Sequence, residues 1–173
     1  MAEYTTTDIR NVVLVGHAGS GKTSLAEALL HKAGAITSAG RVDKGSTTND
    51  FDVLEKKHQH SLEASIGAFH YDKHQINLID TPGAPDFIGV TLGVLSAVET
   101  VVVVINAASG VEGTTRRMME WAKTANRCRM VVVNKVDIPE TDLAGVYDEI
   151  RDAFGRECLA VNLPASDATT VVD

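Results

Sequence analysis

Eight consecutive residues near the start of the chain have the types and spacing of a phosphate-binding loop. They fit the pattern G-x-x-x-x-G-K-[ST] and are followed by Ser24; in order they are Gly16, His17, Ala18, Gly19, Ser20, Gly21, Lys22 and Thr23. Glycines let backbone N–H groups approach an anion, because no Cβ stands in the way. The Lys22 ammonium can then neutralise the β- and γ-phosphates of a nucleotide, and the Thr23 hydroxyl can bind Mg²⁺. This stretch predicts a nucleoside triphosphate site.

The segments on either side supply the elements that such a loop needs. Residues 10–15 are an apolar, β-branched run, which predicts a strand, and residues 24–33 have helical periodicity up to Gly34. The free N–H groups and the dipole of a helix N-terminus favour a bound anion. The sequence therefore places the phosphates between a strand and a helix.

Two further motifs follow predicted strands. The strand at residues 74–79 is followed by a turn that consists of Asp80, Thr81, Pro82, Gly83 and Ala84. Asp80 is a second group for Mg²⁺, and the Gly83 N–H is open to a γ-phosphate. After the strand at residues 128–133 come Asn134, Lys135, Val136 and Asp137. The carboxyl ends of parallel strands share one sheet edge, so all three motifs are expected to meet.

Asp137 indicates which base is bound. Guanine presents N1–H and N2–H₂ side by side, and one carboxylate can accept from both, whereas adenine has no such pair of donors. GTP and GDP are therefore the predicted ligands, and an adenine-dependent ATPase is disfavoured. The Lys135 stem can lie on the base, and Asn134 can either contact the base or brace the phosphate loop.

The remaining pattern predicts an α/β fold, with a mainly parallel sheet, one antiparallel edge strand and helices on both faces. A hairpin is expected at residues 62–71 and 74–79, with its turn at Asp72 and Lys73. Other expected strands are residues 100–105, 128–133 and 159–163, and other expected helices are residues 86–98, 113–126 and 141–154. Met118, Met119 and Trp121 are expected to be core residues rather than a ligand box.

Composition limits the classes of function. The 173 residues carry a formal net charge of −7, which gives no electrostatic footprint for direct nucleic-acid readout by this domain. Cys128 and Cys158 have no zinc-site spacing and are expected to be free thiols. No apolar run approaches the roughly 18 residues that span a bilayer. We expect a cytoplasmic, monomeric chain with no membrane partner.

The order GHAGSGKT, DTPG, NKVD resembles that of translational GTPases and, within them, the amino-terminal G domain of elongation factor G and its relatives. DTPGAPDF is similar to the DTPGHVDF of that family, and Arg10, Asn11, His17, Gly110 and Val111 also fit, so the resemblance covers about residues 8–173. It implies a P-loop GTPase fold, Mg²⁺ as cofactor, and a GTP/GDP switch that acts with the ribosome.

The resemblance also implies two switch segments. The polar stretch at residues 35–60 is similar to switch I, and residues 80–89 are similar to switch II, which the γ-phosphate orders. Ser61 then stands where the family has the threonine that meets Mg²⁺, so the expected metal ligands are Thr23, Ser61 and Asp80. Thr47 and Thr48 remain alternatives to Ser61.

Two departures concern hydrolysis. The switch II histidine that positions water in the family is Ala84 here, and the common P-loop aspartate is Gly19, which leaves Lys22 and Gly83 as the expected catalytic groups. The sequence therefore predicts strong GTP and GDP binding with very slow intrinsic hydrolysis. His58 or His60 is an alternative source of an imidazole. A GTP- or GDP-sensing module that acts through a protein partner outside translation is the alternative function.

The resemblance divides the chain into three parts. Residues 1–7 are a polar tail, residues 8–163 are the G domain without its closing segment, and residues 164–173 are similar to the start of an inserted subdomain. The chain is thus expected to be the amino-terminal part of a larger factor. The alternative is a minimal GTPase in which Ala165 and Ser166 are a degenerate closing motif.

Overall fold

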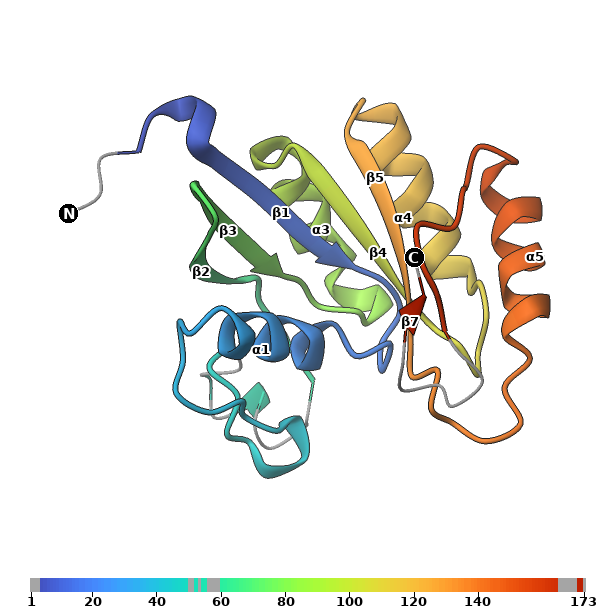
Figure 1. Cartoon of the computed structure of the whole chain (residues 1–173), viewed down its shortest axis with the longest axis horizontal. Helices are drawn as coiled ribbons and strands as arrows, with labels where there is room; N and C mark the ends of the chain where they lie inside the picture. Colours follow the sequence, from blue (N-terminus) through green and yellow to red (C-terminus); the bar gives the residue numbers. More distant parts are fainter. Residues whose placement is uncertain (1–3, 50–51, 53, 56–59, 165–170, 173) are drawn as a thin grey trace.

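A five-stranded sheet forms the centre of the molecule (Figure 1). The computed structural model describes residues 4–49, 52, 54–55, 60–164 and 171–172. The strand order is β2-β3-β1-β4-β5, and the strands are β1 (Ile9–Val15), β2 (Ser65–Tyr71), β3 (His74–Asp80), β4 (Thr100–Asn106) and β5 (Cys128–Asn134). All neighbours are parallel except β2 and β3. The predicted sheet, with its antiparallel edge strand, is confirmed.

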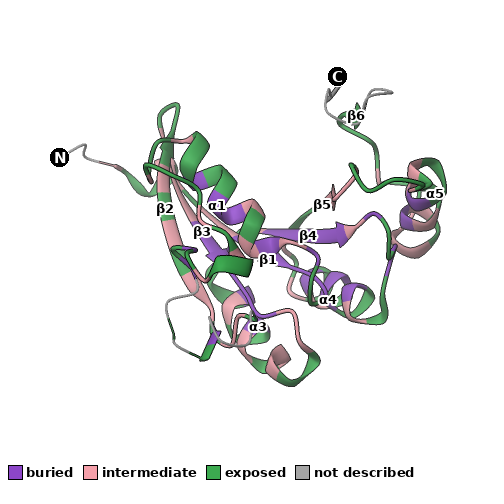
Figure 2. Cartoon of the chain, turned by 90° about the horizontal axis from the view of Figure 1, so that it is seen from below, coloured by how far each residue is buried: buried purple, intermediate pink, exposed green. Residues whose placement is uncertain are grey.

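Helices pack on both faces of this sheet, as predicted. Helix α1 (Lys22–Lys32) covers one face, where Ala26 packs with Leu14 and Leu78. The other face is covered by α3 (Ile88–Val94), α4 (Gly113–Thr124) and α5 (Leu143–Phe154). Figure 2 shows α1 above the strands and α3 and α4 below them, with the buried residues concentrated between.

The core consists of apolar side chains that successive residues of the central strands place on the two faces of the sheet. Residues 101–105 of β4 are all buried, which a strand covered on both faces requires. Met118 and Met119 of α4, which were expected in the core, are buried there beside Ala122, and Trp121 packs against the same cluster. Apolar burial of this extent fixes the register of the strands and thereby the positions of the loops at their carboxyl ends.

The hairpin is shorter than predicted. Its turn lies at Asp72, whose φ of 52° is in the left-handed region that aspartate tolerates. The strand prediction at residues 62–64 was wrong, because β2 begins at Ser65. Leu62 and Glu63 instead donate their backbone N–H groups to the carboxylate of Glu55, so these groups do not pair with a neighbouring strand.

Helix boundaries also differ from the prediction. The segment predicted as one helix at residues 86–98 consists of α3 flanked by the 3-10 turns Pro85–Phe87 and Leu95–Ala97. Gly89 and Gly93 lower its helix propensity. Helix α5 begins at Leu143 rather than at residue 141, because the Asp142 carboxylate accepts the Gly145 N–H at 3.0 Å and caps the helix.

The strand predicted at residues 159–163 was wrong for residues 159–162. Residues 159–162 form no strand, and Leu159 and Val161 are 77% and 83% exposed, so they cover no sheet face. Leu163–Pro164 forms β6, which pairs antiparallel with β7 (Val171–Val172) in a separate two-stranded ladder. The alternative closing motif, Ala165 and Ser166, lies outside the described residues.

Two further expectations from composition can be compared with the structure. Within the described ranges, no helix is long and apolar enough to cross a membrane. Cys128 and Cys158 are both free thiols, as expected.

Candidate nucleotide-binding site

The loop between β1 and α1 wraps tightly, and its glycines permit this. Gly19 and Gly21 have φ values of 78° and 92°, which other residues rarely adopt. A Cβ on Gly21 would also collide with the Asn134 side chain. Asn134 Nδ2 donates to the Ser20 carbonyl at 2.9 Å. The loop is therefore fastened to the end of β5 across the sheet edge, which is one of the two roles that the sequence left open for Asn134.

Lys22 is buried inside this loop. Its Nζ donates to the carbonyls of Gly16 and His17, each at 3.0 Å, and the residue is 6% exposed. Burial lowers the pKa of Lys22 to about 8, although the nearby Asp80 carboxylate acts in the opposite direction. The ammonium is held at the centre of the loop, where the phosphates are expected.

The switch II turn lies directly on Lys22. A Cβ on Gly83 would stand 2.5 Å from Lys22 Nζ and 2.7 Å from the Ala18 nitrogen, so only glycine permits this approach. Thr81 is fully buried and its hydroxyl donates to the Leu14 carbonyl at 2.7 Å, which ties the turn to β1. The Gly83 backbone is thus beside the predicted γ-phosphate position.

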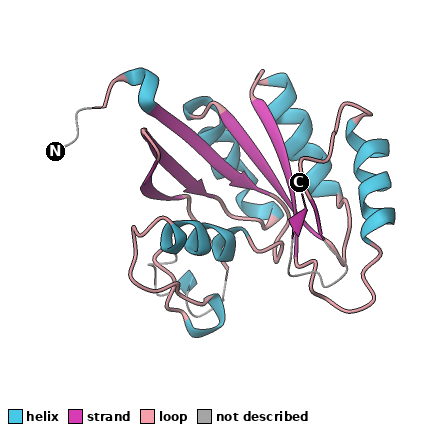
Figure 3. Cartoon of the chain, viewed as in Figure 1, coloured by secondary structure: helices cyan, strands magenta, loops and turns pink. Residues whose placement is uncertain are grey.

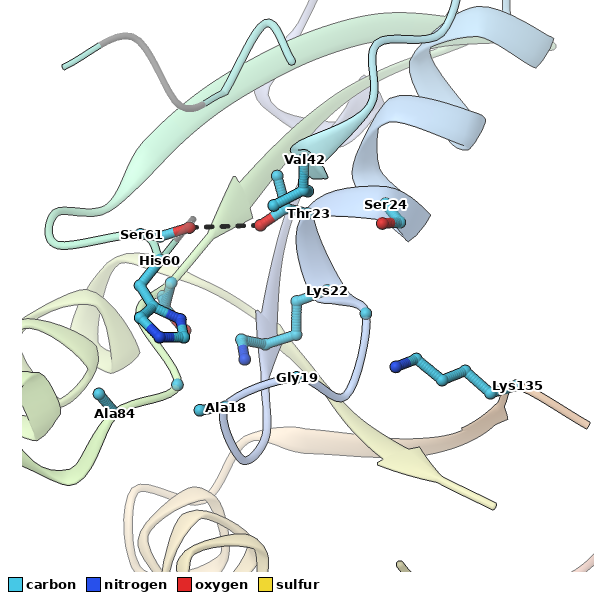
Figure 4. Close-up of a pocket in the computed structure, with 13 residues that line it drawn as sticks. Ala18, Gly19, Lys22, Thr23, Ser24, Val42, His60, Ser61, Ala84 and Lys135 are labelled. Atoms are coloured by element: carbon cyan, nitrogen blue, oxygen red, sulfur yellow. Dashed lines mark hydrogen bonds between the residues drawn. The ribbon is translucent and has the colours of Figure 1, made fainter. Parts of the chain in front are cut away.

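Two hydroxyl groups suited to Mg²⁺ lie side by side here, whereas the predicted carboxylate ligand Asp80 does not line the same cavity. The Thr23 and Ser61 hydroxyls are 3.3 Å apart (Figure 4), and Asp80 is 2% exposed at the end of β3. Oxygen ligands of this kind are what Mg²⁺ prefers, so the residues fit the ion. The alternatives Thr47 and Thr48 do not line the same cavity as Thr23. This placement favours Ser61 among the three.

A cavity of about 210 Å³ joins the segments. Its walls come from the phosphate loop, switch II, the turn after β5 and the connection between α1 and β2; the lining residues are Ala18, Gly19, Gly21, Lys22, Thr23, Ser24, Val42, His60, Ser61, Thr81, Gly83, Ala84 and Lys135. Figure 4 shows the side chains that point into it. Val42, His60 and Ser61, from the predicted switch I region, therefore reach the phosphate region. The sequence analysis did not identify Val42, an isolated apolar residue in a polar loop.

The base-reading turn follows β5. Lys135 has φ of 59°, a left-handed conformation that turns the chain sharply, and its side chain reaches the cavity (Figure 4). Val136 is partly buried, whereas Asp137 is exposed in the turn and does not line the phosphate cavity. This is the arrangement expected of a base site displaced from the phosphates.

His17 connects the phosphate loop to α4. It is 3% exposed, with Nδ1 3.3 Å from the Thr115 hydroxyl and Nε2 3.4 Å from Glu112 Oε1. Burial lowers the pKa of His17, and Glu112 opposes that effect. Nδ1 shares a hydrogen bond with the Thr115 hydroxyl, whereas Nε2 lies near Glu112 without forming a hydrogen bond. Nothing in the sequence indicated the roles of Glu112 and Thr115.

Glu27 holds the connection between α1 and β2, which Figure 3 shows as a long loop beside α1. Glu27 is 1% exposed, and its carboxylate accepts the Gly40 N–H at 2.9 Å and the Thr48 N–H. A buried carboxylate is tolerated only when it is hydrogen-bonded in this way. The sequence analysis missed Glu27, because an acidic residue on a helix usually faces solvent.

We expect Glu27→Ala to destabilise the nucleotide-free protein by about 1–3 kcal/mol, because two partly buried backbone N–H groups lose their charged acceptor. Urea unfolding measures the change, and hydrogen exchange should show faster exchange at Gly40 and Thr48. Glu120→Gln, at an exposed position on α4, is the matched control. Unchanged exchange at Gly40 and Thr48 in Glu27→Ala would contradict this role.

Two relatives are similar in sequence to most of this chain. It is 37% identical over 159 residues to an elongation factor G-like protein of Mycobacterium tuberculosis, a match that covers 92% of this chain and 22% of that protein. It is 34% identical over 149 residues to the tetracycline resistance protein TetM of Enterococcus faecalis, covering 86% of this chain and 23% of that one. The chain thus spans less than a quarter of the length of these relatives.

A solved structure from Thermus thermophilus superposes with a TM-score of 0.88 at 38% identity, covering 95% of this chain and 24% of that one. A bacterial selenocysteine-specific elongation factor shares the fold, with a TM-score of 0.67 at 19% identity, covering 83% of this chain and 23% of that one. The profile of the elongation factor Tu GTP binding domain matches residues 7–171. The chain therefore belongs to the family of the elongation factor Tu GTP-binding domain and is a translational GTPase G domain similar to those of elongation factor G-like proteins.

Proposed function

We propose that this chain is the guanine-nucleotide switch domain of an elongation factor G-like GTPase that acts with the ribosome. The observation that carries the proposal is the bond from Asn134 to the Ser20 carbonyl, because it fastens the base-reading turn to the phosphate loop. One rigid unit then holds both ends of a nucleotide. The similarity to elongation factor G-like proteins supports the ribosome as the partner of the whole protein.

Each part of the site has a role in this proposal. The loop N–H groups and Lys22 bind the phosphates, and Asp137 accepts the two donors of guanine. Thr23, Ser61 and Asp80 are the proposed residues for Mg²⁺, which when bound neutralises charge on the β- and γ-phosphates. The Gly83 N–H is placed to donate to the γ-phosphate, so loss of that phosphate would release switch II.

We propose that intrinsic hydrolysis is slow. The Ala84 methyl group can neither hold a water molecule nor carry charge, and Gly19 has no side chain. Phosphoryl transfer depends on positioning and on charge stabilisation, so each missing group lowers the hydrolysis rate.

The same two residues favour the second candidate, a GTP- or GDP-sensing module that acts through a protein partner outside translation. Stimulation of the full-length protein by ribosomes would support the first candidate, and its absence would support the second.

Residues 8–163 are proposed as the G domain, with residues 164–173 as the start of an inserted subdomain. The outer side of β5 supports this division, because Cys128 is exposed and Met130 is 53% exposed there. Among the described residues, β5 pairs only with β4. A closing segment supplied by a longer chain would cover this edge and complete the guanine pocket. We further propose a cytoplasmic location and a monomeric state for this part of the protein.

Displacement of fluorescent GDP in the presence of Mg²⁺ tests the proposal. We expect unlabelled GDP and a nonhydrolysable GTP analogue to displace the probe, and ATP in large excess not to do so, because adenine lacks the donor pair that Asp137 accepts. Removal of Mg²⁺ by EDTA should weaken binding of the GTP analogue. Equal displacement by ATP and GDP would overturn the guanine assignment.

A further inference from the structure

His60 lines the phosphate cavity together with Gly83 and Ala84. We propose that His60 is a catalytic residue that holds the attacking water and thus provides the imidazole that switch II lacks at Ala84. This inference rests on the proposed function and goes beyond it, because it assigns the chemistry to a residue of switch I. The other histidine of that segment, His58, lies outside the described residues.

The orientation of His60 supports this role. Figure 4 shows its imidazole extending into the cavity toward the Lys22 ammonium, between Ser61 and the Ala84 methyl group. Lys22, Gly83 and Ala84 line the same cavity and surround the predicted γ-phosphate position. An imidazole in this position faces open space, because Ala84 is too small to fill it. A water molecule can occupy that space in contact with both the phosphate and the ring.

His60 and the two residues after it are fastened by hydrogen bonds to Glu55 and Thr23. Glu55 is 3% exposed; its carbonyl accepts the His60 N–H at 3.3 Å, and its carboxylate accepts the Leu62 N–H at 2.9 Å. Ser61 is bonded to Thr23 at 3.3 Å on α1. These hydrogen bonds hold the backbone of His60 at the cavity. A positioned group loses less entropy when it orders a water molecule.

The proposed step conserves atoms and charge. A ring nitrogen of His60 accepts a hydrogen bond from the water, whose oxygen forms a bond to the γ-phosphorus. The bond between the γ-phosphorus and the β–γ bridging oxygen breaks, and its electron pair stays on GDP. The proton of the water ends on inorganic phosphate, and His60 is unchanged. GTP and water give GDP and phosphate, with no other reactant.

Two measurements on the same variants test the assignment. We expect His60→Ala to lower the single-turnover rate of GTP hydrolysis at least tenfold, because water positioning by one side chain is commonly worth that much or more. Affinity for GDP with aluminium fluoride, which mimics the transferring phosphoryl group, should fall at least tenfold. Affinity for GDP alone should change by less than about twofold, since GDP has no γ-phosphate.

Two further variants make the result specific. His31→Ala removes an exposed histidine from the last turn of α1 and should behave as the wild type in every assay. Adding Ala84→His to His60→Ala returns an imidazole to the cavity and should restore much of the lost rate. An unchanged rate and unchanged aluminium fluoride affinity in His60→Ala would overturn the assignment. A wild-type rate of GTP hydrolysis no faster than that of GTP in buffer would also overturn the assignment. Failure of the wild type to bind GDP would instead overturn the proposed function itself.

Discussion

Replacing Lys22 with methionine is expected to weaken GDP binding by a factor of about 100 to 1,000. The ammonium is buried at the centre of the phosphate loop and is held by the Gly16 and His17 carbonyls. Removing one partner of a buried charge pair costs about 3–4 kcal/mol in binding, and each 1.4 kcal/mol is a factor of ten. Isothermal titration with GDP and Mg²⁺ measures the loss.

Protein stability separates this effect from misfolding. The pKa of Lys22 is lowered to about 8 in the folded state, so at pH 7 the charged lysine opposes folding by about 3 kcal/mol. The two hydrogen bonds of the ammonium, which methionine cannot make, offset part of this cost. The methionine variant should therefore unfold at a similar or higher urea concentration than the wild type at pH 7. A large drop in stability would mean that lost binding reflects damage to the fold.

The pH dependence of binding gives a second measurement of the same residue. Above a pH of about 8 the nucleotide-free protein loses the Lys22 proton, and phosphate binding then has to take that proton up again. The dissociation constant for GDP should therefore rise as pH increases from about 7 to about 9, approaching tenfold per pH unit at the upper end. The methionine variant should lack this contribution. Identical pH profiles for the two proteins would contradict the lowered pKa.

The sequence predicted those parts of the fold that local pattern determines. The unbroken valines of β4 indicated a strand buried on both faces, and Asp72 marked the hairpin turn. Residues 62–64 and 159–162 were predicted wrongly as strands, because a short apolar or alternating run does not show whether a neighbouring strand is available. For Leu62 the competing acceptor was the Glu55 carboxylate, seven residues earlier in the chain.

In the candidate site, too, local patterns predict some residues, and the positions of others depend on the fold. The glycines, Lys22 and Asp137 occur in patterns whose spacing is set by the nucleotide, so the sequence alone predicts them as site residues. Glu27 and His17 act through groups that are distant in sequence, such as Thr48 and Thr115, and no local pattern reveals such pairs. The position of His60 beside Ala84 likewise depends on how the connection between α1 and β2 folds over the phosphate loop.

Asparagine in place of Asp137 is expected to change the preferred base from guanine to xanthine. The carboxylate accepts from guanine N1–H and N2–H₂, and two charge-assisted bonds of about 1.5 kcal/mol or more each amount to a factor of about 100 in affinity. Asparagine can still accept from N1–H, but its amide N–H₂ faces the N2–H₂ donors. Xanthine has a carbonyl at that position, which the amide can donate to. The affinity for GDP should fall about 100-fold, and the affinity for xanthosine diphosphate (XDP) should rise.

Exposure of Asp137 makes this a clean test of recognition. The residue lies in a turn on the surface and outside the phosphate cavity, so its replacement should leave both the fold and Lys22 undisturbed. Asp148→Asn, on the exposed face of α5, removes the same charge from the protein without touching the turn. It should keep the wild-type ratio of GDP to XDP affinity. If Asp137→Asn keeps that ratio as well, the base is recognised elsewhere, and the turn after β5 serves only to brace the phosphate loop through Asn134.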